Sequence, residues 1–390
     1  MPKSIGVGIV GYAFMGQAHS QAWRTVAHAF DVPLVPRLVA LSGRDRQRGA
    51  AAATKLGWES FENDWRSLVA EDDVEIVDIC APGDTHAPIA LAALAAGKQV
   101  LCEKPLANTL AEAREMAVAA RRAAHRGVRA MVGFNYRRVP ALALARQLVS
   151  KGQLGEIRHL RAVYLQDWLV DPASPLTWRL DAAKAGSGAL GDLGAHIVDL
   201  AQWILGDRIA SVTAMTETFV RERPLQDQPG RRGPVTVDDA ALFLARFALG
   251  TVATFEATRF SAGRKNVLRI EIDGALGSLA FDLERLNELS YADGRAPGSL
   301  SGFRRVLVTE ADHPYMQAWY PTGHVLGWEH TFTHEVFDFL SAIADGTEPQ
   351  PSFADGYDVQ CVLDAVARSA ASGTWIQPST FSLDTKMETV

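Results

Sequence analysis

The segment GYAFMG at residues 11–16 constrains the fold of this chain more than any other. It follows the apolar run 5–11 and precedes a helical pattern that extends from residue 15 to about residue 28. The two end glycines permit a tight turn and close helix–strand packing, and the helix N-terminus offers unpaired N–H groups to phosphates. Alanine replaces the middle glycine of the usual GxGxxG pattern. The turn predicts a dinucleotide-binding βαβ unit whose cofactor contacts Gly11, Ala13, Phe14, Met15 and Gly16.

The first third of the chain alternates between continuous apolar runs and helical patterns. The apolar runs cover residues 5–11, 37–43, 75–82, 99–105 and 128–134. Strands that are apolar throughout are typical of a parallel sheet with helices on both faces. We therefore predict an α/β domain with a Rossmann-type parallel sheet over residues 1–135.

The pattern changes after about residue 136. Residues 156–168 alternate between polar and apolar, and β-rich runs follow at 208–220, 238–260 and 266–283. Such alternation is typical of an antiparallel sheet with one face in water. We predict a second, α+β domain over residues 136–390, built on a large open, mostly antiparallel sheet. The polar segment 221–234 is predicted to be an exposed loop, and helices are predicted at 140–151, about 326–344 and 354–371.

The end of the second predicted strand bears on the type of dinucleotide. It reads SGRDR over residues 42–46, and a hydroxyl with two arginines suits a ribose 2′-phosphate. We therefore assign Ser42 and Arg44 to the cofactor, and this segment favours NADP. Asp45 keeps NAD open as an alternative, although it can instead cap the next helix. Asp31 has a suitable spacing for a ribose contact but precedes the strand.

The segment LCEKPLA at residues 101–107 follows the fourth predicted strand. Ligands bind at the carboxyl ends of strands in open α/β sheets, so Lys104 is expected beside a nicotinamide. The alternative is a surface lysine paired with Glu103. Residues near the ends of the last three strands are also assigned to the cofactor, namely Pro82, His86, Glu103, Lys104 and Asn135.

The segment GDLGAHIVDLAQW at residues 191–203 places Asp192 and His196 four residues apart, on one face of a predicted helix. The glycines around this helix start are expected to leave room for a substrate and a nicotinamide. The same two side chains could instead be metal ligands, as could His330 and His334. No third ligand has a matching spacing, so we predict no metal site.

In this order, the glycine-rich turn, the EKP segment and the Asp-x-x-x-His helix resemble the glucose-fructose oxidoreductase / inositol dehydrogenase (Gfo/Idh/MocA) family. The resemblance covers essentially the whole chain. It implies that Lys104, Asp192 and His196 form a catalytic group. It also implies a homodimer or homotetramer that assembles through the C-terminal sheet.

Four further segments resemble sugar dehydrogenases of this family that oxidise the C3 hydroxyl of an anhydro-sugar, such as levoglucosan, with NAD. They are YLQDWLVDPASPLTWRL (164–180), AGSGALGD (185–192), GFNYRR (133–138) and GHVLGWEHTF (323–332). This resemblance implies that Gln166, Trp168 and Arg179 line a sugar pocket. The chain departs from these enzymes at Gly43, where they carry an acid, and this departure puts the preference for NAD in doubt.

A polyol needs several hydrogen-bonding groups and a flat apolar platform. Tyr136, Gln166, Trp168, Trp178 and Arg179 supply both near the motifs, although the tryptophans could serve the core alone. His324 is expected to reach the same pocket. The predicted site for a sugar or polyol therefore comprises Lys104, Tyr136, Gln166, Trp168, Arg179, Asp192, His196 and His324.

The predicted reaction is hydride transfer between a secondary alcohol and a nicotinamide. His196 is the favoured base because imidazole titrates near neutrality, while Lys104 polarises the reacting oxygen and Asp192 binds an adjacent hydroxyl. Which of Lys104 and His196 first accepts the proton is left open. The alternatives are an inositol or other cyclic-polyol dehydrogenase, a keto-sugar reductase, or a non-catalytic cofactor-binding regulatory protein.

Composition narrows the choice of partners. The 390 residues carry a formal charge of −6, so the chain lacks the basic surplus expected of a protein that binds nucleic acid or an anionic membrane. No apolar run is long enough to span a bilayer. The three cysteines have no CxxC spacing, which indicates reduced thiols and a cytoplasmic location.

Overall fold

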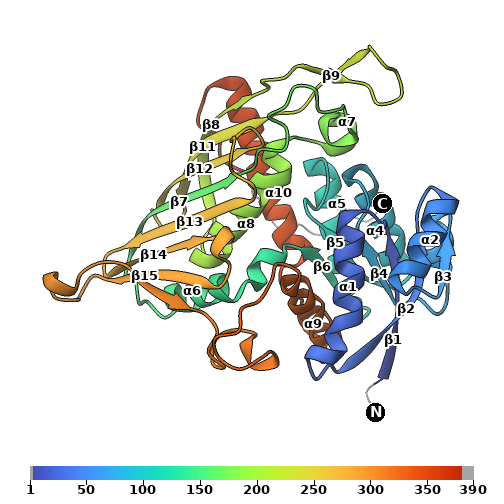
Figure 1. Cartoon of the computed structure of the whole chain (residues 1–390), viewed down its shortest axis with the longest axis horizontal. Coiled ribbons are helices and arrows are strands. Elements are labelled where there is room, and N and C mark those ends of the chain that lie inside the picture. The colour runs from blue at the N-terminus through green and yellow to red at the C-terminus, as the bar shows by residue number, and fades with distance from the viewer. Residues whose placement is uncertain (1–2, 380–390) are drawn as a thin grey trace.

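The computed structural model describes residues 3–379 and contains two large sheets (Figure 1). The first has six parallel strands in the order β3-β2-β1-β4-β5-β6. This confirms the predicted parallel sheet. Sequence analysis missed the short strand β3 and helix α3. The elements are β1 (Lys3–Val10), α1 (Phe14–Ala29), β2 (Leu34–Ser42), α2 (Arg46–Leu56), β3 (Ser60–Glu62), α3 (Trp65–Ala70), β4 (Ile76–Ile79), α4 (His86–Ala95), β5 (Gln99–Glu103), α5 (Leu110–Ala124) and β6 (Ala130–Gly133).

The second sheet has eight strands in the order β16-β15-β14-β13-β7-β12-β11-β8. All neighbouring pairs are antiparallel except β12 and β7, which run parallel. The predicted mostly antiparallel sheet is therefore confirmed. Its strands are β7 (Ile157–Leu165), β8 (Ile209–Glu217), β11 (Ala240–Phe247), β12 (Val252–Thr258), β13 (Val267–Gly274), β14 (Gly277–Asp282), β15 (Glu288–Asp293) and β16 (Arg304–Leu307).

Alternation along the strands gives this second sheet one covered face and one open face. On β11, Phe243, Ala245 and Phe247 are buried, whereas Leu242 and Leu244 are exposed. Helices α6 (Pro140–Ser150), α8 (Ala195–Leu205) and α10 (Phe353–Ser372) lie between the two sheets (Figure 1). α8 packs on β7 and α10 packs on β8, so helices cover the inner face.

The segment 221–234 departs from the predicted loop. Strands β9 (Glu222–Pro224) and β10 (Arg232–Pro234) pair there as a short antiparallel hairpin. Arg223 explains why the hairpin folds back onto the protein. Its buried guanidinium donates to the backbone oxygens of Leu169, Asp171 and Ser174.

The last two helices return to the first sheet. α9 (His330–Asp345) packs on α1, and α10 packs on α5 and β6. The Val132 N–H donates to the Pro351 carbonyl at 2.9 Å, which ties the end of β6 to the start of α10. We propose residue 135 as the domain boundary along the chain, with α9 and α10 shared between the two parts. Among residues 3–379, no helix is long and apolar enough to cross a membrane.

Glu335 on α9 is an unusual buried acid at this junction. Among the described residues, both of its carboxyl oxygens lack a hydrogen-bond partner, and its ion-pair contact is with Arg138, whose Nη1 lies 3.8 Å from Oε1. Burial raises the pKa of Glu335 to about 8, so its neutral form is the one that fits the folded state. The unfolded chain releases this proton near pH 4.5.

We predict that Glu335→Gln is more stable than wild type at alkaline pH. The folded-state pKa is raised, so wild type loses stability as pH rises from about 4.5 to about 8. Glutamine does not titrate, so the free energy of unfolding of the variant rises relative to that of wild type by up to about 1.4 kcal/mol per pH unit in that window. Denaturant unfolding of both proteins from pH 5 to 9 measures this difference. Parallel stability curves would contradict the prediction.

Candidate active site

The glycine-rich turn fits a dinucleotide phosphate. Gly11 has a φ of +108°, and a Cβ on it would lie 2.5 Å from the Cys80 carbonyl oxygen. A Cβ on Gly16 would lie 2.1 Å from the Gly11 oxygen. The N-cap of α1 is Ala13, whose side chain accepts no hydrogen bond. The first-turn N–H groups of α1 therefore remain available for an anion, as phosphate binding at a helix N-terminus requires.

The carboxyl end of β2 carries no free acid. The Asp45 carboxylate caps α2 by accepting from the Arg48 N–H at 3.0 Å. Asp31 precedes β2, so it lies at the opposite end of this strand from the turn. Of the two residues assigned to a 2′-phosphate, Ser42 is buried and Arg44 is exposed. Both lie away from the large cavity described next.

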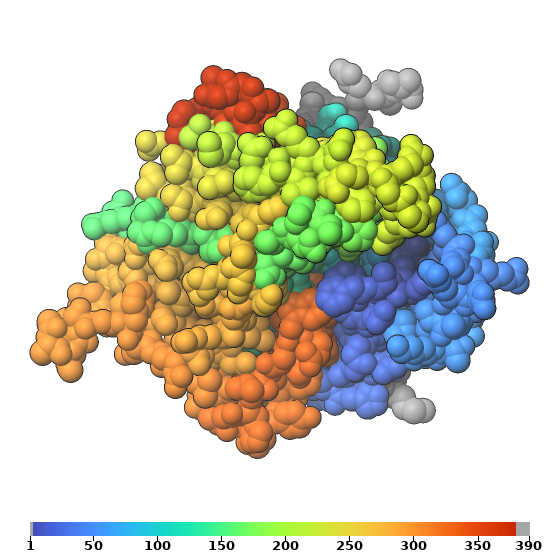
Figure 2. Space-filling view, turned by 45° about the horizontal axis from the view of Figure 1, so that its top comes forward, coloured from blue at the N-terminus to red at the C-terminus, as the bar shows by residue number. Residues whose placement is uncertain are grey.

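A cavity of about 480 Å³ opens between the two halves of the chain. In Figure 2 the green segment near residues 165–185 and the dark orange segment near residues 320–330 both meet the dark blue start of the first domain. Cofactor and substrate predictions converge here. The predicted residues that line the cavity are Ala13, Phe14, Met15, Pro82, His86, Glu103, Lys104, Asn135, Tyr136, Gln166, Trp168, Trp178, Arg179, Asp192 and His196.

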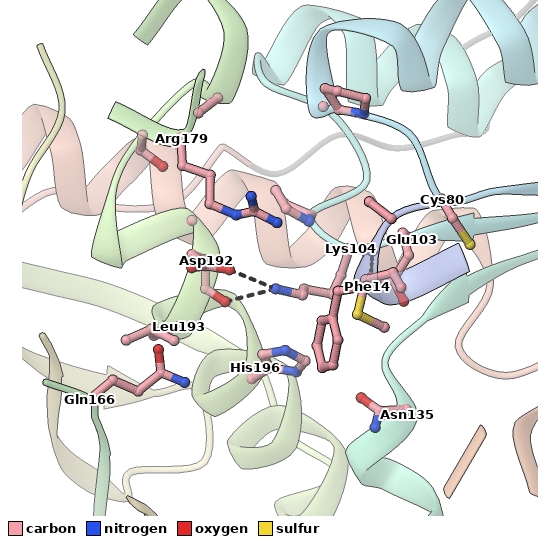
Figure 3. Close-up of a pocket in the computed structure, with 18 of the residues that line it drawn as sticks. Phe14, Cys80, Glu103, Lys104, Asn135, Gln166, Arg179, Asp192, Leu193 and His196 are labelled. Atoms are coloured by element: carbon pink, nitrogen blue, oxygen red, sulfur yellow. Dashed lines mark hydrogen bonds and ion pairs between the residues drawn. The ribbon is translucent and has the colours of Figure 1, made fainter. Parts of the chain in front are cut away.

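Lys104 and Asp192 meet across this cavity (Figure 3). The Lys104 Nζ donates to Asp192 Oδ1 at 3.0 Å and to the Asp192 carbonyl at 2.9 Å. Arg259, which directly follows β12, donates to Asp192 Oδ2 at 3.0 Å. Burial opposes ionisation of this carboxyl, but Lys104 and Arg259 outweigh it and hold the pKa of Asp192 well below its ordinary value. Asp192 is therefore a permanent carboxylate.

His196 lies beside this ion pair and is held as a neutral ring. Burial, helped by the Lys104 charge, lowers the pKa of His196 well below its ordinary value. Its Nδ1 is buried and has no hydrogen-bond partner among the described residues. Tyr136 packs against the ring at a centroid distance of 4.7 Å. A neutral imidazole with unused nitrogen capacity can accept a proton.

The helix that carries these two residues differs from the predicted one. Leu190–Gly194 form a π-helical segment, and α8 begins only at residue 195. π-helical turns inside helices are often found at functional sites. Of the preceding glycines, Gly191 lines the cavity, but the reason for Gly188 needs correction. A Cβ on Gly188 would lie 1.7 Å from the Asp238 carbonyl oxygen, so the glycine there permits contact between chain segments rather than room for a ligand.

A chain of hydrogen bonds lines the far wall of the cavity. Trp168 Nε1 donates to Gln166 Oε1 at 3.0 Å, and Gln166 Nε2 donates to Asn266 Oδ1 at 2.7 Å. The Tyr164 hydroxyl donates to the same oxygen at 2.9 Å and contacts the Tyr136 hydroxyl at 2.9 Å. Tyr136 itself is buried, so it supports the wall more than it faces a ligand.

Arg179 is directed into the cavity from the opposite side (Figure 3). Its guanidinium lies over the Trp178 ring at 4.4 Å, and burial lowers its pKa. Trp168 is partly exposed and carries the Arg259 guanidinium 5.2 Å from its ring centroid. Polar groups and aromatic faces therefore alternate around the cavity, as a sugar-binding site requires.

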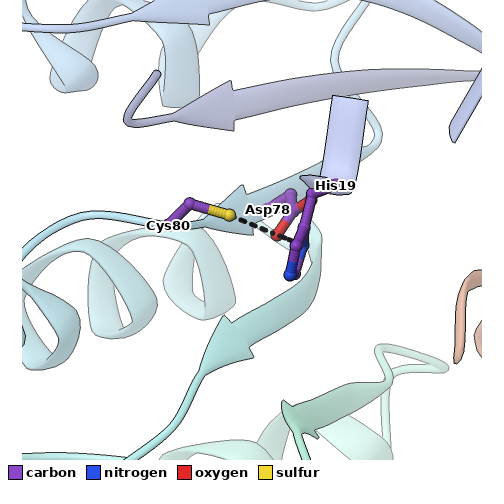
Figure 4. A group of neighbouring side chains, drawn as sticks. All are labelled: His19, Asp78 and Cys80. Atoms are coloured by element: carbon purple, nitrogen blue, oxygen red, sulfur yellow. Dashed lines mark hydrogen bonds and ion pairs between the residues drawn. The ribbon is translucent and has the colours of Figure 1, made fainter. Parts of the chain in front are cut away.

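A buried ionic network supports the turn that carries Lys104, and Figure 4 shows two of its members, His19 and Asp78, beside Cys80. His19 Nδ1 lies 2.9 Å from Asp78 Oδ2, and His19 Nε2 lies 3.0 Å from Glu103 Oε1. Burial lowers the pKa of His19, but Asp78 outweighs it and raises the pKa well above its ordinary value. The second Glu103 oxygen accepts the Lys104 N–H at 3.0 Å. Asp78 and Glu103 thus hold a buried imidazolium directly beneath the lysine.

One expectation and two alternatives from the sequence find no support in this geometry. His324 lies outside the cavity because its exposed ring turns Nδ1 toward the Pro321 carbonyl at 2.7 Å. His334 offers no free metal ligand because its nitrogens contact the Arg138 carbonyl and the Trp319 indole N–H. Glu103 is not a surface partner of Lys104, since it faces His19 instead.

Several residues of the cavity wall were missed from the sequence. They are Cys80, Asn108, Tyr164, Ser187, Arg259, Asn266, Trp328 and Phe332. The sequence carried a signal for Arg259 and Asn266, because each is a polar residue at the end of an apolar strand. Their spatial neighbours, however, lie more than 60 positions away in the sequence.

Comparisons with known proteins agree with this geometry. Residues 5–134 match a family model described as "Oxidoreductase family, NAD-binding Rossmann fold", which defines the class as NAD-binding oxidoreductases. Residues 142–280 match the GFO/IDH/MocA C-terminal domain. The chain therefore belongs to the GFO/IDH/MocA oxidoreductase family, as the motifs indicated.

Levoglucosan dehydrogenase of Pseudarthrobacter phenanthrenivorans is 40% identical to this chain over 387 residues, which span 96% of this chain and 98% of that enzyme. A solved structure of levoglucosan dehydrogenase in complex with NADH and levoglucosan has a TM-score of 0.93 at 41% identity, covering 97% and 100% of the two chains. An oxidoreductase domain protein from Kribbella flavida reaches a TM-score of 0.94 at 60% identity, again covering 97% and 100%.

We predict that Arg259→Gln lowers kcat/KM by about 100-fold. Loss of the guanidinium frees one oxygen of Asp192 and loosens its position relative to Lys104, and misplacement of about 1 Å has an effect of that size. Steady-state kinetics measure this loss. Arg269→Gln is the control, since Arg269 pairs with Asp282 on the surface of β13. Equal activity of the Arg259 and Arg269 variants would contradict the prediction.

Proposed function

We propose that this protein oxidises a secondary hydroxyl of a sugar or anhydro-sugar, with hydride transfer to NAD or NADP. The position oxidised is the C3 hydroxyl of a levoglucosan-like ring. The observation that carries the proposal is the contact between Lys104 and Asp192 beside the neutral His196. These three residues line the same cavity as Ala13, Phe14 and Met15 of the glycine-rich turn. The named activity of the levoglucosan dehydrogenase relative supports the substrate class.

The proposed mechanism assigns one task to each of three side chains. His196 accepts the hydroxyl proton, and its lowered pKa keeps the ring neutral for that purpose. Two of the three Lys104 N–H bonds point to Asp192, which leaves one to polarise the reacting oxygen. The ionised Asp192 accepts a hydrogen bond from an adjacent hydroxyl. When bound, the nicotinamide supplies the acceptor for the hydride.

We predict that His196→Ala lowers kcat by about 100- to 10,000-fold, the usual contribution of a general base. In wild type, kcat/KM falls as pH drops through the pKa of His196, because the protonated ring cannot accept a proton. Since that pKa is lowered, the acidic limb lies below about pH 6.5. Absorbance at 340 nm across pH 4.5–9 measures both effects. His324→Ala serves as the control. Unaltered turnover in the His196 variant would show that His196 is not the base.

The proposed cofactor preference is for NADP over NAD, although both are accepted. The Tyr12 ring occupies the space beside Gly43, where a Cβ would lie 2.2 Å from Tyr12 Cε1. A ribose-binding acid at position 43 therefore requires the Tyr12 ring to move. The exposed Arg44 is the nearest free charge at this strand end, and it suits a 2′-phosphate.

We predict that the double variant Tyr12→Ala/Gly43→Asp lowers the ratio of kcat/KM for NADP to that for NAD by at least about tenfold, or about 1.4 kcal/mol. The new carboxylate can bind ribose hydroxyls and repels a phosphate. Gly43→Asp alone should change the ratio less than the double variant, because its carboxylate must first displace the Tyr12 ring. Arg44→Gln should weaken NADP only, and Arg48→Gln is the matched control. The assignment would be contradicted if wild type prefers NAD and the Arg44→Gln variant uses NADP as well as wild type does.

The proposed assembly is a homodimer or homotetramer through the open face of the large sheet. Met215 on β8 lies opposite Leu242 on β11, and both are exposed together with Leu244 and Val252. An apolar surface of this kind favours burial against a second copy. A cytoplasmic location is proposed because Cys80, Cys102 and Cys361 are buried and unpaired.

A further inference from the structure

A second cavity, of about 430 Å³, adjoins the proposed active site. It is formed by the segment 283–288, by Leu307 on β16 and by residues 325–328. Asn266 and Trp328 line both cavities, so the two spaces share a wall. Neither the family models nor the proposed reaction assigns a role to this second space.

Asn266 connects the two cavities chemically. Its Oδ1 accepts from Tyr164 and Gln166, both of which line the active-site cavity. These bonds fix the orientation of the amide, and its Nδ2 has no hydrogen-bond partner among the described residues. A fixed amide with a free N–H group is a suitable donor to a ligand that spans both spaces.

The charges in the second cavity favour a neutral, hydroxyl-rich ligand. Glu288 is neutralised by Arg305 at 3.2 Å and Arg285 at 4.0 Å. Glu284 has no cation partner among the described residues, and its Oε1 accepts only a long 3.4 Å bond from the Asn266 N–H. A free carboxylate accepts hydrogen bonds from hydroxyl groups and repels phosphates and carboxylates.

The remaining wall is apolar and preformed. Val325 is 62% exposed and Leu307 is 40% exposed, so both leave aliphatic surface uncovered at the cavity. Both amide atoms of Asn287 bond the backbone of Leu326 at 2.9 Å, which fixes the segment that carries Val325. Trp328 stacks on Phe14 and donates to the Tyr136 hydroxyl. An aromatic and aliphatic wall with one carboxylate and one amide is suited to a sugar ring.

We propose that this cavity is a subsite for the second sugar unit of a glycoside whose first unit is oxidised in the active site. The inference rests on the proposed function, since it names a larger substrate for the same reaction. The shared lining residues explain the choice of occupant, because a second sugar unit linked to the first would reach the second cavity past Asn266 and Trp328.

Paired substrates test this proposal. For wild type, kcat/KM is measured with methyl glucoside and levoglucosan, and with the neutral disaccharides cellobiose, maltose and trehalose. We expect at least one disaccharide to match or exceed methyl glucoside. Val325→Trp, which fills the second cavity, should lower kcat/KM for that disaccharide by tenfold or more and change the small substrates by less than twofold. Glu284→Gln should lower it by three- to tenfold.

Leu300→Trp is the matched control, since Leu300 is 77% exposed and lies outside both cavities. Oxidation of the small sugars but of no disaccharide would overturn the subsite and leave the proposed function intact. Equal losses for small and large substrates in Val325→Trp would also overturn it.

If no sugar is oxidised, the proposed function fails. Calorimetric titration of cellobiose, maltose and trehalose into wild type and Val325→Trp then decides the subsite: binding to wild type that is lost in the variant supports it, and any other result overturns it.

Discussion

The site depends on one carboxylate that stays charged between two halves of the chain. Asp192 receives Lys104 from the first half of the chain and Arg259 from the second, so this half-buried anion has both of its cation partners only when the two halves are in place. A desolvated charge that loses a partner is unfavourable. The Lys104 contact therefore joins the two domains at this point, and the Lys104 charge, added to burial, keeps His196 in its neutral form.

The sequence predicts best the features that rest on local patterns. The parallel sheet, the turn at Gly11 and the convergence of Lys104 with Asp192 follow from apolar periodicity, glycine chemistry and motif order. The hairpin at 222–234, the π-helical segment and the role of Gly188 depend on contacts with distant segments, such as Arg223 with Asp171 and Gly188 with Asp238. Arg259 and Asn266 escaped notice for the same reason, since their roles depend on strand order rather than on neighbours in the chain.

A buried set of hydrogen bonds holds the turn that carries Lys104 in place. Asp78 and Glu103 each accept a hydrogen bond from the His19 imidazolium, and Glu103 also accepts one from the backbone N–H of Lys104. A side chain held from both its backbone and its terminal amine has little freedom to leave the productive geometry. Supporting interactions of this kind commonly determine how precisely a catalytic group is positioned. The conflict between Tyr12 and Gly43 shows the same principle at the ribose end, where one side chain decides what its neighbour can be.

The return of α9 and α10 to the first sheet has a consequence for how this protein can be divided. Two helices from the far end of the chain cover the side of the cofactor half that faces the second sheet, because α9 packs on α1 and α10 packs on α5. Residues 1–135 released alone would expose those faces to water, so the cofactor half is not an autonomous module. Exchange of the catalytic half between relatives would have to leave both helices with the cofactor half. Recombination in this architecture is therefore limited to segments inserted between residue 135 and α9.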